Sequence, residues 1–346
     1  MVYDVIVIGA GQAGLSMGYY LKQTNLSFII LDKAKEIGEV WKNRYDSLTL
    51  FTPRSYSSLP GLKMEGNQNQ YPNKDEVAIY LNQYANNYSL PVQLNTVVER
   101  VTKTDNEFNV ITNKETLGAR KVIIATGPFQ NPFIPEFSKE LSKNIYQVHS
   151  SHYKNPNQLN EGSVLVVGGG NSGAQIAVEV SKDRETYFSV SHKMKFLPQD
   201  IGNKSIFWYF DKLGIYRANV HSKIGQFLKN QNDPIFGFEL KFKLRKEKIK
   251  LKPRTTSLVK DTIVFNDGSK VKVNNVIWAT GFKSDYRWID IPNLINENGY
   301  PIQERGITKI DGLYFLGLAW QSSRGSALIQ GVGGDAAYLF QDIIKD

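Results

Sequence analysis

The pattern of apolar positions contains two short runs of aliphatic residues, each of which leads into a glycine-rich segment. The first run is residues 5–8 (VIVI) and the second is residues 164–167 (VLVV). Uninterrupted apolar runs of this length are typical of strands buried on both faces of a parallel sheet. A helix and a second strand are expected after each run, at residues 15–22 and 28–31 in the first unit and at 174–181 and 187–190 in the second. The pattern therefore predicts two βαβ units.

A second pair of similar segments follows, one after each unit. Residues 122–127 (VIIATG) and 276–281 (VIWATG) both end an apolar strand in a tight turn. We therefore predict an α/β protein with two Rossmann-like dinucleotide-binding domains, in the three-layer architecture of flavoproteins that bind two dinucleotides, the second domain being inserted in the first. The predicted domains are residues 1–157 with 278–346 and residues 158–277, the latter containing a helical insertion at about residues 197–246.

Composition excludes several kinds of chemistry. The 346 residues are 41% hydrophobic and 22% charged, which is ordinary for a globular protein. The absence of cysteine excludes disulfides, thiol nucleophiles, redox dithiols and iron–sulfur clusters. The four histidines show no tight ligand spacing, so no metal site is expected. No apolar run reaches the ~18 residues of a membrane span, and the start (MVYD) has no basic leader, so we expect a cytoplasmic protein.

The net charge of +9 is concentrated in residues 241–254 (KFKLRKEKIKLKPR), which hold eight Lys and Arg against one Glu. Such a stretch can bind nucleic acid or a membrane surface. We favour a solvated helix end that runs into a strand with outward lysines, because no aromatic stacking platform accompanies it. No nucleic acid partner is expected.

The two glycine segments have the GxGxxG spacing of dinucleotide-binding loops. Each follows an expected strand and opens an expected helix, which is the context that gives this motif its meaning. The first glycine allows a tight turn, the second lets the backbone approach a pyrophosphate, and the third lets helix and strand pack closely. The pyrophosphate then lies on unpaired N–H groups at the helix N-terminus. The two loops comprise Gly9, Gly11, Gln12, Ala13 and Gly14, and Gly168, Gly170, Asn171, Ser172 and Gly173.

The residue at the end of each second strand indicates which nucleotide binds. Asp32, followed by Lys33, can accept both ribose hydroxyls and repels a 2′-phosphate, which suits FAD or NAD. At the same offset the second unit has Ser191, followed by His192 and Lys193, which favours NADPH. No arginine adjoins these residues, so NADH remains an alternative. Two dinucleotides on one chain imply a flavin that accepts hydride from a nicotinamide.

These motifs together resemble the class B flavin-containing monooxygenases, and more closely their short bacterial branch, over nearly the whole chain. Residues 39–45 (EVWKNRY) are similar to the stretch in which the family packs a Trp and an Arg against FAD. Residues 48–61 (LTLFTPRSYSSLPG) are similar to a loop of that branch, and residues 149–153 (HSSHY) match the second half of the family's FxGxxxHxxxY/F fingerprint. Residues 320–339 resemble the flavin-facing C-terminal loop and helix.

The resemblance implies the site and its chemistry. NADPH reduces FAD, O2 adds to give a flavin C4a-(hydro)peroxide, and one oxygen passes to a sulfide, an amine or a ketone. Phe51 and Asn171 are the expected active-site positions, acting by position because the flavin performs the chemistry. Expected FAD contacts beyond the first loop, Asp32 and Lys33 are Val40, Trp41, Arg44, Leu50, Thr52, Val98, Ala125, Thr126, Gly127, Gly317 and Gln330. Expected NAD(P)H contacts beyond the second loop and residues 191–193 are Ala279, Thr280 and Gly281.

Three departures from the family pattern matter. The fingerprint's Phe and Gly fall on Lys143 and Ile145, and its last residue is Tyr153, which points away from the Baeyer–Villiger branch. The Gly-Asp that holds the ribitol in many related reductases is Gly317-Leu318 here. Phe51 stands where longer relatives carry an asparagine, and it cannot donate a hydrogen bond. We therefore expect leakage to H2O2.

Asn171 and the enzyme class leave alternatives open. The Asn171 side chain either supports the helix start locally or faces the nicotinamide and flavin. Instead of a monooxygenase, the chain could be an NAD(P)H-dependent flavin reductase that passes electrons to a protein carrier, with residues 241–254 docking an acidic partner, or a low-turnover redox sensor. Expected partners of the monooxygenase are O2 and a small molecule, and a homodimer is a further alternative.

Overall fold

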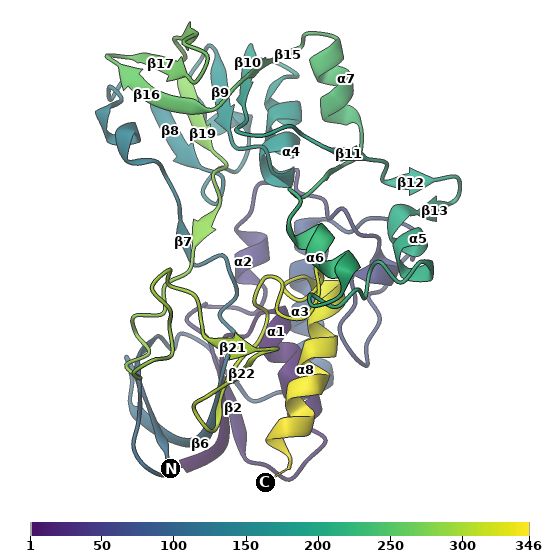
Figure 1. The fold of residues 1–346 in the computed structure, drawn as a ribbon, viewed down its shortest axis with the longest axis vertical. Coiled ribbons are helices and arrows are strands. Elements are labelled where there is room, and N and C mark those ends of the chain that lie inside the picture. The colour runs from purple at the N-terminus through teal and green to yellow at the C-terminus, as the bar shows by residue number, and fades with distance from the viewer. Residues whose placement is uncertain (1, 346) are drawn as a thin grey trace.

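The computed structural model describes residues 2–345, which form a mixed α/β fold with two main sheets, the first with both parallel and antiparallel pairings and the second parallel (Figure 1). The first sheet has the order β21-β22-β23-β6-β1-β2-β3, and β4 and β5 extend it from β6 as an antiparallel ribbon. Its strands are β1 (Val2–Ile8), β2 (Phe28–Leu31), β3 (Val92–Gln93), β4 (Val98–Lys103), β5 (Phe108–Thr112), β6 (Thr116–Ile124), β21 (Gln303–Glu304), β22 (Ile307–Thr308) and β23 (Leu313–Phe315).

The second sheet has the order β15-β10-β9-β19-β8, and every neighbouring pair in it is parallel. Its strands are β8 (Tyr146–His149), β9 (Val164–Val167), β10 (Thr186–Ser189), β15 (Ile249–Lys252) and β19 (Asn275–Trp278). An antiparallel ribbon of β16 (Thr255–Val259), β17 (Thr262–Phe265) and β18 (Lys270–Val271) lies beside it, and its β17–β18 turn is the Asn-Asp-Gly at residues 266–268. β1 and β9 are fully buried in their central residues, as their apolar sequences predict.

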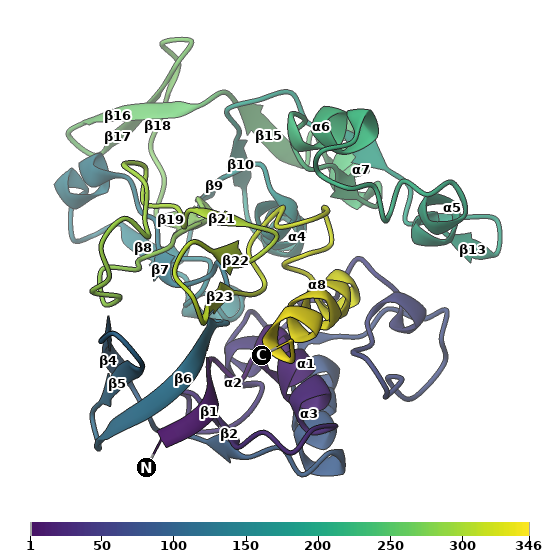
Figure 2. The same ribbon diagram turned by 60° about the horizontal axis from the view of Figure 1, so that its bottom comes forward.

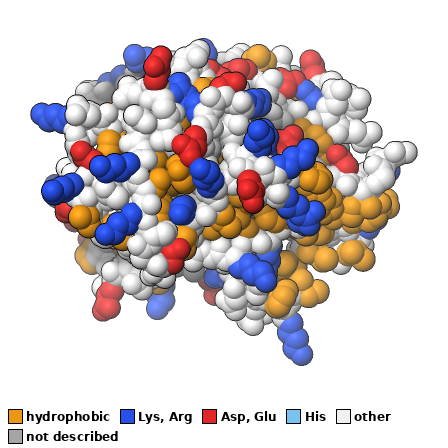
Figure 3. Space-filling model, turned by 90° about the horizontal axis from the view of Figure 1, so that it is seen from above, with side chains coloured by type: hydrophobic (Ala, Val, Ile, Leu, Met, Phe, Trp, Pro, Cys, Tyr) orange, Lys and Arg blue, Asp and Glu red, His pale blue; other side chains and the backbone are white. Residues whose placement is uncertain are grey.

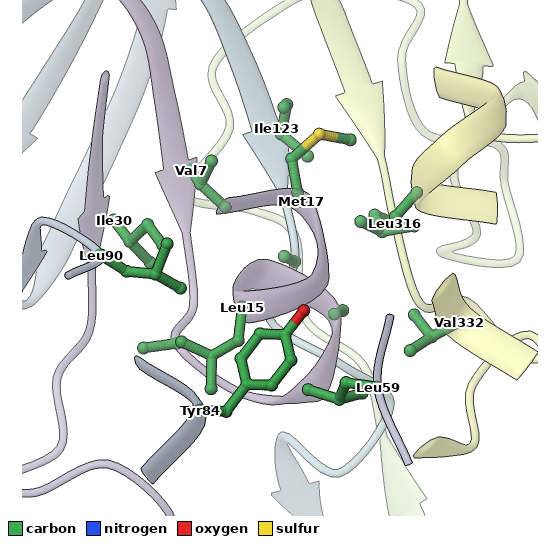
Figure 4. Close-up of a cluster of buried hydrophobic side chains, with 14 of the residues drawn as sticks. Val7, Leu15, Met17, Ile30, Leu59, Tyr84, Leu90, Ile123, Leu316 and Val332 are labelled. Atoms are coloured by element: carbon green, nitrogen blue, oxygen red, sulfur yellow. The ribbon is translucent and has the colours of Figure 1, made fainter. Parts of the chain in front are cut away.

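Helices cover one face of the first sheet and bury its core (Figure 2). α1 packs against α8 and α3, and the cluster between them includes Val7, Leu15 and Met17, all with no exposed surface (Figure 4). Gly18 permits this packing, since a Cβ there would lie 2.7 Å from Ile30 Cδ1. The helices are α1 (Gln12–Leu21), α2 (Glu39–Lys42), α3 (Lys74–Asn87), α4 (Asn171–Val180), α5 (Ile206–Lys212), α6 (Lys223–Lys229), α7 (Glu239–Arg245) and α8 (Ile329–Ile343), with 3-10 turns η1 (Arg54–Tyr56), η2 (Glu136–Glu140) and η3 (Pro156–Gln158).

The chain crosses between the two sheets on a pair of short antiparallel strands, β7 (Asn131–Pro132) and β20 (Phe282–Lys283). The second sheet therefore lies between two parts of the first in sequence. β8, which begins at residue 146, already belongs to the second sheet. By sheet membership the chain therefore enters the second sheet before residue 146, whereas the sequence motifs predicted that the first domain segment extends to residue 157.

The segment expected to be a helical insertion, residues 197–246, is more mixed than its sequence suggested. It contains α5, α6 and α7, but also the antiparallel pair β12 (Asp200–Ile201) and β13 (Lys204–Ser205) and the parallel pair β11 (Phe196–Leu197) and β14 (Ile235–Phe236). Val220 N donates to Ser322 O (2.7 Å), and Tyr71 Oη donates to Asp200 Oδ1 (2.6 Å), so the insertion is joined to both the C-terminal loop and the loop before α3.

Candidate active site

A cleft of about 400 Å³ lies at the carboxyl ends of β1, β2 and β6. This edge is where open α/β sheets bind nucleotides, because strand ends and helix starts converge there. Thirteen of the residues expected to contact FAD line the cleft: Gly9, Gly11, Gln12, Ala13, Asp32, Lys33, Val40, Trp41, Val98, Ala125, Thr126, Gly127 and Gly317. The cleft is therefore assembled from segments spread over most of the chain.

The three glycines of the first loop have different roles in the folded chain. Gly9 has φ +111°, and a Cβ there would lie 2.5 Å from Ala125 O. A Cβ on Gly14 would lie 1.8 Å from Gly9 O, so Gly14 is required for the helix to pack on the strand. A Cβ on Gly11 would meet no atom within 4 Å. The fold itself does not require glycine at position 11, so the space there fits a group that approaches the backbone, as a pyrophosphate does.

The second loop repeats this geometry. Gly168 has φ +123°, and its Cβ would lie 2.1 Å from Ala279 O, while a Cβ on Gly173 would lie 2.0 Å from Gly168 O. A Cβ on Gly170 would again meet nothing within 4 Å. The turns at Gly127 and Gly281, which face the two loops, also share positive φ values and open surroundings. Each sheet thus presents one open glycine at the start of a helix, and each site fits a dinucleotide pyrophosphate.

Asp32 is oriented by backbone groups on both sides of the cleft. Its Oδ2 accepts from Ala10 N (2.6 Å) and its Oδ1 accepts from Ala34 N (2.8 Å). Each carboxylate oxygen has a further lone pair, so Asp32 can still accept from ribose hydroxyls that enter the cleft. The corresponding edge of the second sheet carries no carboxylate: Ser191 is exposed, and its Oγ lies 3.5 Å from His192 Nδ1.

Arg44 and His149 join the two Ala-Thr-Gly turns. The Arg44 guanidinium lies over the ring of Phe129, which follows the first turn, at 5.5 Å, and over the ring of Phe282, which follows the second, at 5.7 Å. His149 Nδ1 accepts from Ser151 N (3.1 Å), so Nε2 carries the proton and donates to Gly281 O (2.9 Å). Burial lowers the pKa of His149, and positive charge on His152 and Arg44 lowers it further. His149 is therefore a neutral positioning residue.

Comparison with known proteins identifies the family of this chain. The sequence model of the pyridine nucleotide-disulphide oxidoreductases matches residues 6–199, more than half of the chain. The chain belongs to this family. An uncharacterized CzcO-like oxidoreductase of Geobacillus kaustophilus is 60% identical over 99% of both chains. A probable indole-3-pyruvate monooxygenase of Arabidopsis thaliana, YUCCA3, is 28% identical over 93% of this chain and 84% of its own. The solved structure of a flavin-containing monooxygenase from Stenotrophomonas maltophilia is 30% identical, with a TM-score of 0.84 over 99% of this chain and 98% of its own.

These similarities confirm the predicted kinship with flavin monooxygenases and the prediction of an NAD(P)H-dependent flavin oxidoreductase. For the part of the chain that the structure describes, no helix is long and apolar enough to cross a membrane.

The Asn171 side chain neither caps its helix nor is left unpaired: it is hydrogen-bonded to the insertion. The N-cap of α4 is Gly170, and the Asn171 side chain does not cap the helix. Its Nδ2 donates to Pro234 O (3.1 Å) and its Oδ1 accepts from Phe236 N (3.1 Å). Both ends of the amide are thus engaged by the insertion, and Asn171 in this oxidoreductase holds β14 over the start of α4.

Phe51 belongs to an aromatic cluster between the first domain and the insertion. Its ring stacks on Phe236 with centroids 4.8 Å apart and on Phe207 with centroids 5.9 Å apart. Phe236 is the residue whose N–H bonds Asn171. The two expected active-site positions therefore meet through one residue of the insertion, a connection that the sequence motifs did not suggest.

Four other expected FAD residues lie outside the lining of the cleft. Leu50 packs against both hydrophobic cores, Thr52 is buried with its Oγ1 2.8 Å from Ser57 Oγ, and Arg44 lies between the two turns. Gln330 lines a second cavity of about 460 Å³, between the insertion and the 53–58 segment. Gly14 is also outside, because its role is helix packing.

Sequence reasoning missed several residues that line the cleft, among them Thr96, Gln130 and Trp288. Gln130 Nε2 donates to Thr126 Oγ1 (3.1 Å) and Gly127 O (3.0 Å), while its Oε1 accepts from Asp285 N (2.7 Å). Gln130 thus ties the Ala-Thr-Gly turn to a segment more than 150 positions away. Only the short distance of Gln130 from the turn in sequence could have drawn attention to it.

Proposed function

We propose that the chain is an FAD-dependent monooxygenase that uses NADPH, and also accepts NADH, to transfer one oxygen atom of O2 to a small sulfide or amine or to a ketone. The observation that carries this proposal is the pair of open glycines, Gly11 and Gly170, each at a helix start beside an Ala-Thr-Gly turn. Two such sites on one chain suit one flavin and one nicotinamide dinucleotide. The flavin-containing monooxygenase of Stenotrophomonas maltophilia, similar over its whole length, supports this choice.

The absence of cysteine limits the electron acceptors that a reduced flavin on this chain can use. A reductase that relays electrons through its own redox-active disulfide would reduce that disulfide to a dithiol, but this chain has no cysteine to form one. The electrons must go to O2 or to an external acceptor. Oxygenation of a sulfide balances as NADPH + H⁺ + O2 + sulfide → NADP⁺ + sulfoxide + H2O, and leakage balances as NADPH + H⁺ + O2 → NADP⁺ + H2O2.

FAD, when bound, supplies hydride acceptance and reactivity toward O2, and the residues of the chain supply position. N–H groups at the start of α1 would hold the pyrophosphate beside Gly11, and Asp32 would accept from the ribose. The start of α4, beside Gly170, would hold the NADPH pyrophosphate in the same way. Trp41 packs against both hydrophobic cores and borders the cleft, where it would help to exclude water from bound flavin.

The leading alternative is a flavin reductase that docks an acidic protein carrier on residues 241–254. On the face of the molecule seen in Figure 3, Lys and Arg side chains are interspersed with Asp and Glu and do not form a continuous patch. Lys250 of this stretch is paired with Glu185 (2.5 Å). These observations favour the monooxygenase. A low-turnover sensor is the third possibility, and turnover measurements separate it from both enzymes.

The deciding experiment follows labelled oxygen. The purified holoprotein is given NADPH, methyl phenyl sulfide and ¹⁸O2, and the product is analysed by mass spectrometry. We expect methyl phenyl sulfoxide that carries ¹⁸O, together with H2O2. No labelled product with any sulfide, amine or ketone, combined with rapid reduction of ferricyanide, would favour the reductase, and negligible NADPH oxidation would favour the sensor.

A further inference from the structure

We propose that Arg254 completes the NADPH site by binding the adenosine 2′-phosphate, a role that rests on the proposed function. Ser191, His192 and Lys193 stand where that phosphate would lie, and they lack the planar guanidinium that binds phosphate with two parallel hydrogen bonds. Arg254 is more than 60 positions away in sequence. The topology of the second sheet brings it to the same edge.

The first step of the argument is strand register. β10 and β15 are parallel neighbours, with Ser189 opposite Lys252. Two positions further along each strand stand Ser191 and Arg254. Val190 N donates to Lys252 O (3.0 Å), so the pairing continues past the end of β10. Neighbouring strands lie about 4.8 Å apart, and both chains leave the sheet at its carboxyl edge, where the adenosine end of a dinucleotide binds.

The second step is the rigidity of the turn that carries Arg254. The buried Ser189 Oγ donates to Pro253 O (2.8 Å) and accepts from Thr255 N (3.1 Å). These two bonds clamp the residues before and after Arg254 to the end of β10. On the other side, Asn266 N donates to Arg254 O (2.8 Å). Residues 253–255 are thus held by three hydrogen bonds, one of them at Arg254 itself, although the Arg254 side chain is exposed.

The third step concerns the partners of the Lys and Arg side chains in residues 241–254. Lys250 pairs with Glu185, Lys252 lies over the Phe265 ring at 5.5 Å, and Lys241 lies over the Phe238 ring at 5.2 Å. Among the described residues, no ion pair involves Arg254. Asp267, in the β17–β18 turn that Asn266 begins, accepts from Ser269 N (2.9 Å), and the hydrogen bonds of Ser269 lower the pKa of Asp267. Arg254 therefore combines a backbone anchored at the strand edge with an exposed side chain that makes no ion pair among the described residues.

The test compares nucleotides that differ only in the 2′-phosphate. Binding of 2′,5′-ADP and of 5′-AMP to the FAD-loaded protein is measured by calorimetry for the wild type, Arg254→Gln, Arg254→Lys and Arg245→Gln. Arg245→Gln is the matched control, because it removes the same charge from the same stretch on the exposed α7. We expect Arg254→Gln to weaken 2′,5′-ADP about tenfold or more and to leave 5′-AMP unchanged, with an intermediate loss for Arg254→Lys. In turnover, the KM for NADPH should rise while the KM for NADH and both kcat values stay constant.

The outcomes separate this proposal from the proposed function. If the wild type prefers 2′,5′-ADP and Arg254→Gln keeps that preference, the assignment of Arg254 is wrong while NADPH use stands. Equal losses in Arg254→Gln and Arg245→Gln would show general charge attraction and would also overturn it. If the wild type itself binds 2′,5′-ADP and 5′-AMP equally, both the Arg254 assignment and the NADPH preference are wrong.

Discussion

At the scale of single residues, the clearest feature is the contrast between glycines that the fold needs and glycines that a ligand needs. Gly14 and Gly173 cannot carry a Cβ without striking the backbone of their own loops. Gly11 and Gly170 can, and their backbone φ values of −77° and −83° are accessible to any residue. The GxGxxG motif already assigns a tight turn to the first glycine, pyrophosphate approach to the second and helix–strand packing to the third. The surroundings of the glycines in both loops fit that division, because a Cβ at the first or third position would strike backbone and one at the second would meet no atom within 4 Å.

This contrast gives a prediction with its own control. Gly11→Val should fold with near wild-type stability and lose most of its FAD, since a Cβ at this position meets no protein atom within 4 Å and the side chain would occupy the space proposed for the pyrophosphate. Gly170→Val should keep FAD and lose NADPH binding. Gly14→Ala should destabilise the protein by about 3 kcal/mol or more, because of the backbone clash. Flavin absorbance after gel filtration, nucleotide titration and urea unfolding give the three readouts. Full FAD retention in Gly11→Val would show that the cofactor is placed wrongly.

His149 gives a pH prediction. Because burial lowers its pKa in the folded state, the unfolded chain binds the proton more readily, and stability falls as pH drops through the unfolded value of about 6.5. At higher pH this contribution is fully present. His149→Gln keeps a donor for Gly281 O and removes the titration. Thermal midpoints between pH 7.5 and 5.5 should therefore fall less in His149→Gln than in the wild type. His221→Gln, at an exposed position, is the control and should follow the wild type.

At the scale of elements, the regular units were predictable and their connections were not. The β-branched runs predicted β1 and β9, and α1 and α4 follow them as expected, each beginning three residues earlier than the apolar pattern indicated. The insertion was harder to predict from its sequence. Its small strand pairs contain two residues per strand, too few to show a periodicity, and β11 and β14 pair across nearly forty residues of sequence.

Asn171 tests whether β14 is held over the start of α4 by one side chain. Asn171→Ala removes a donor to Pro234 O and an acceptor for Phe236 N, which should cost about 1–3 kcal/mol because those backbone groups lose their partner. Limited proteolysis between residues 231 and 238 should become faster. Asn230→Ala, an exposed change at the end of α6, should alter neither rate nor stability. Equal protection of both variants would mean that the aromatic cluster alone holds the strand.

At the scale of the whole molecule, the two sheets and the insertion meet around a few side chains. Arg44 lies between the rings that follow the two Ala-Thr-Gly turns, and Phe51 lies against the insertion. Resemblance to the flavin monooxygenases drew attention to both residues, but their contacts come from segments far apart in sequence. Under the proposed function, a change at position 51 would affect both oxygen transfer and this packing, so a single substitution there cannot separate the two effects.

The last prediction therefore uses two substitutions at position 51. In the wild type we expect most NADPH to yield H2O2 and only a minor share to yield sulfoxide, since Phe51 cannot donate a hydrogen bond to the reacting oxygen. One missing bond of about 1–3 kcal/mol corresponds to a roughly 5- to 150-fold loss of lifetime. Phe51→Leu and Phe51→Asn both lose the stacking on Phe236 and Phe207, but only asparagine adds an amide. Sulfoxide formed per NADPH consumed should rise in Phe51→Asn and not in Phe51→Leu. An equal yield in the two variants would assign the leakage to packing, and near-complete coupling in the wild type would show that the phenylalanine is harmless.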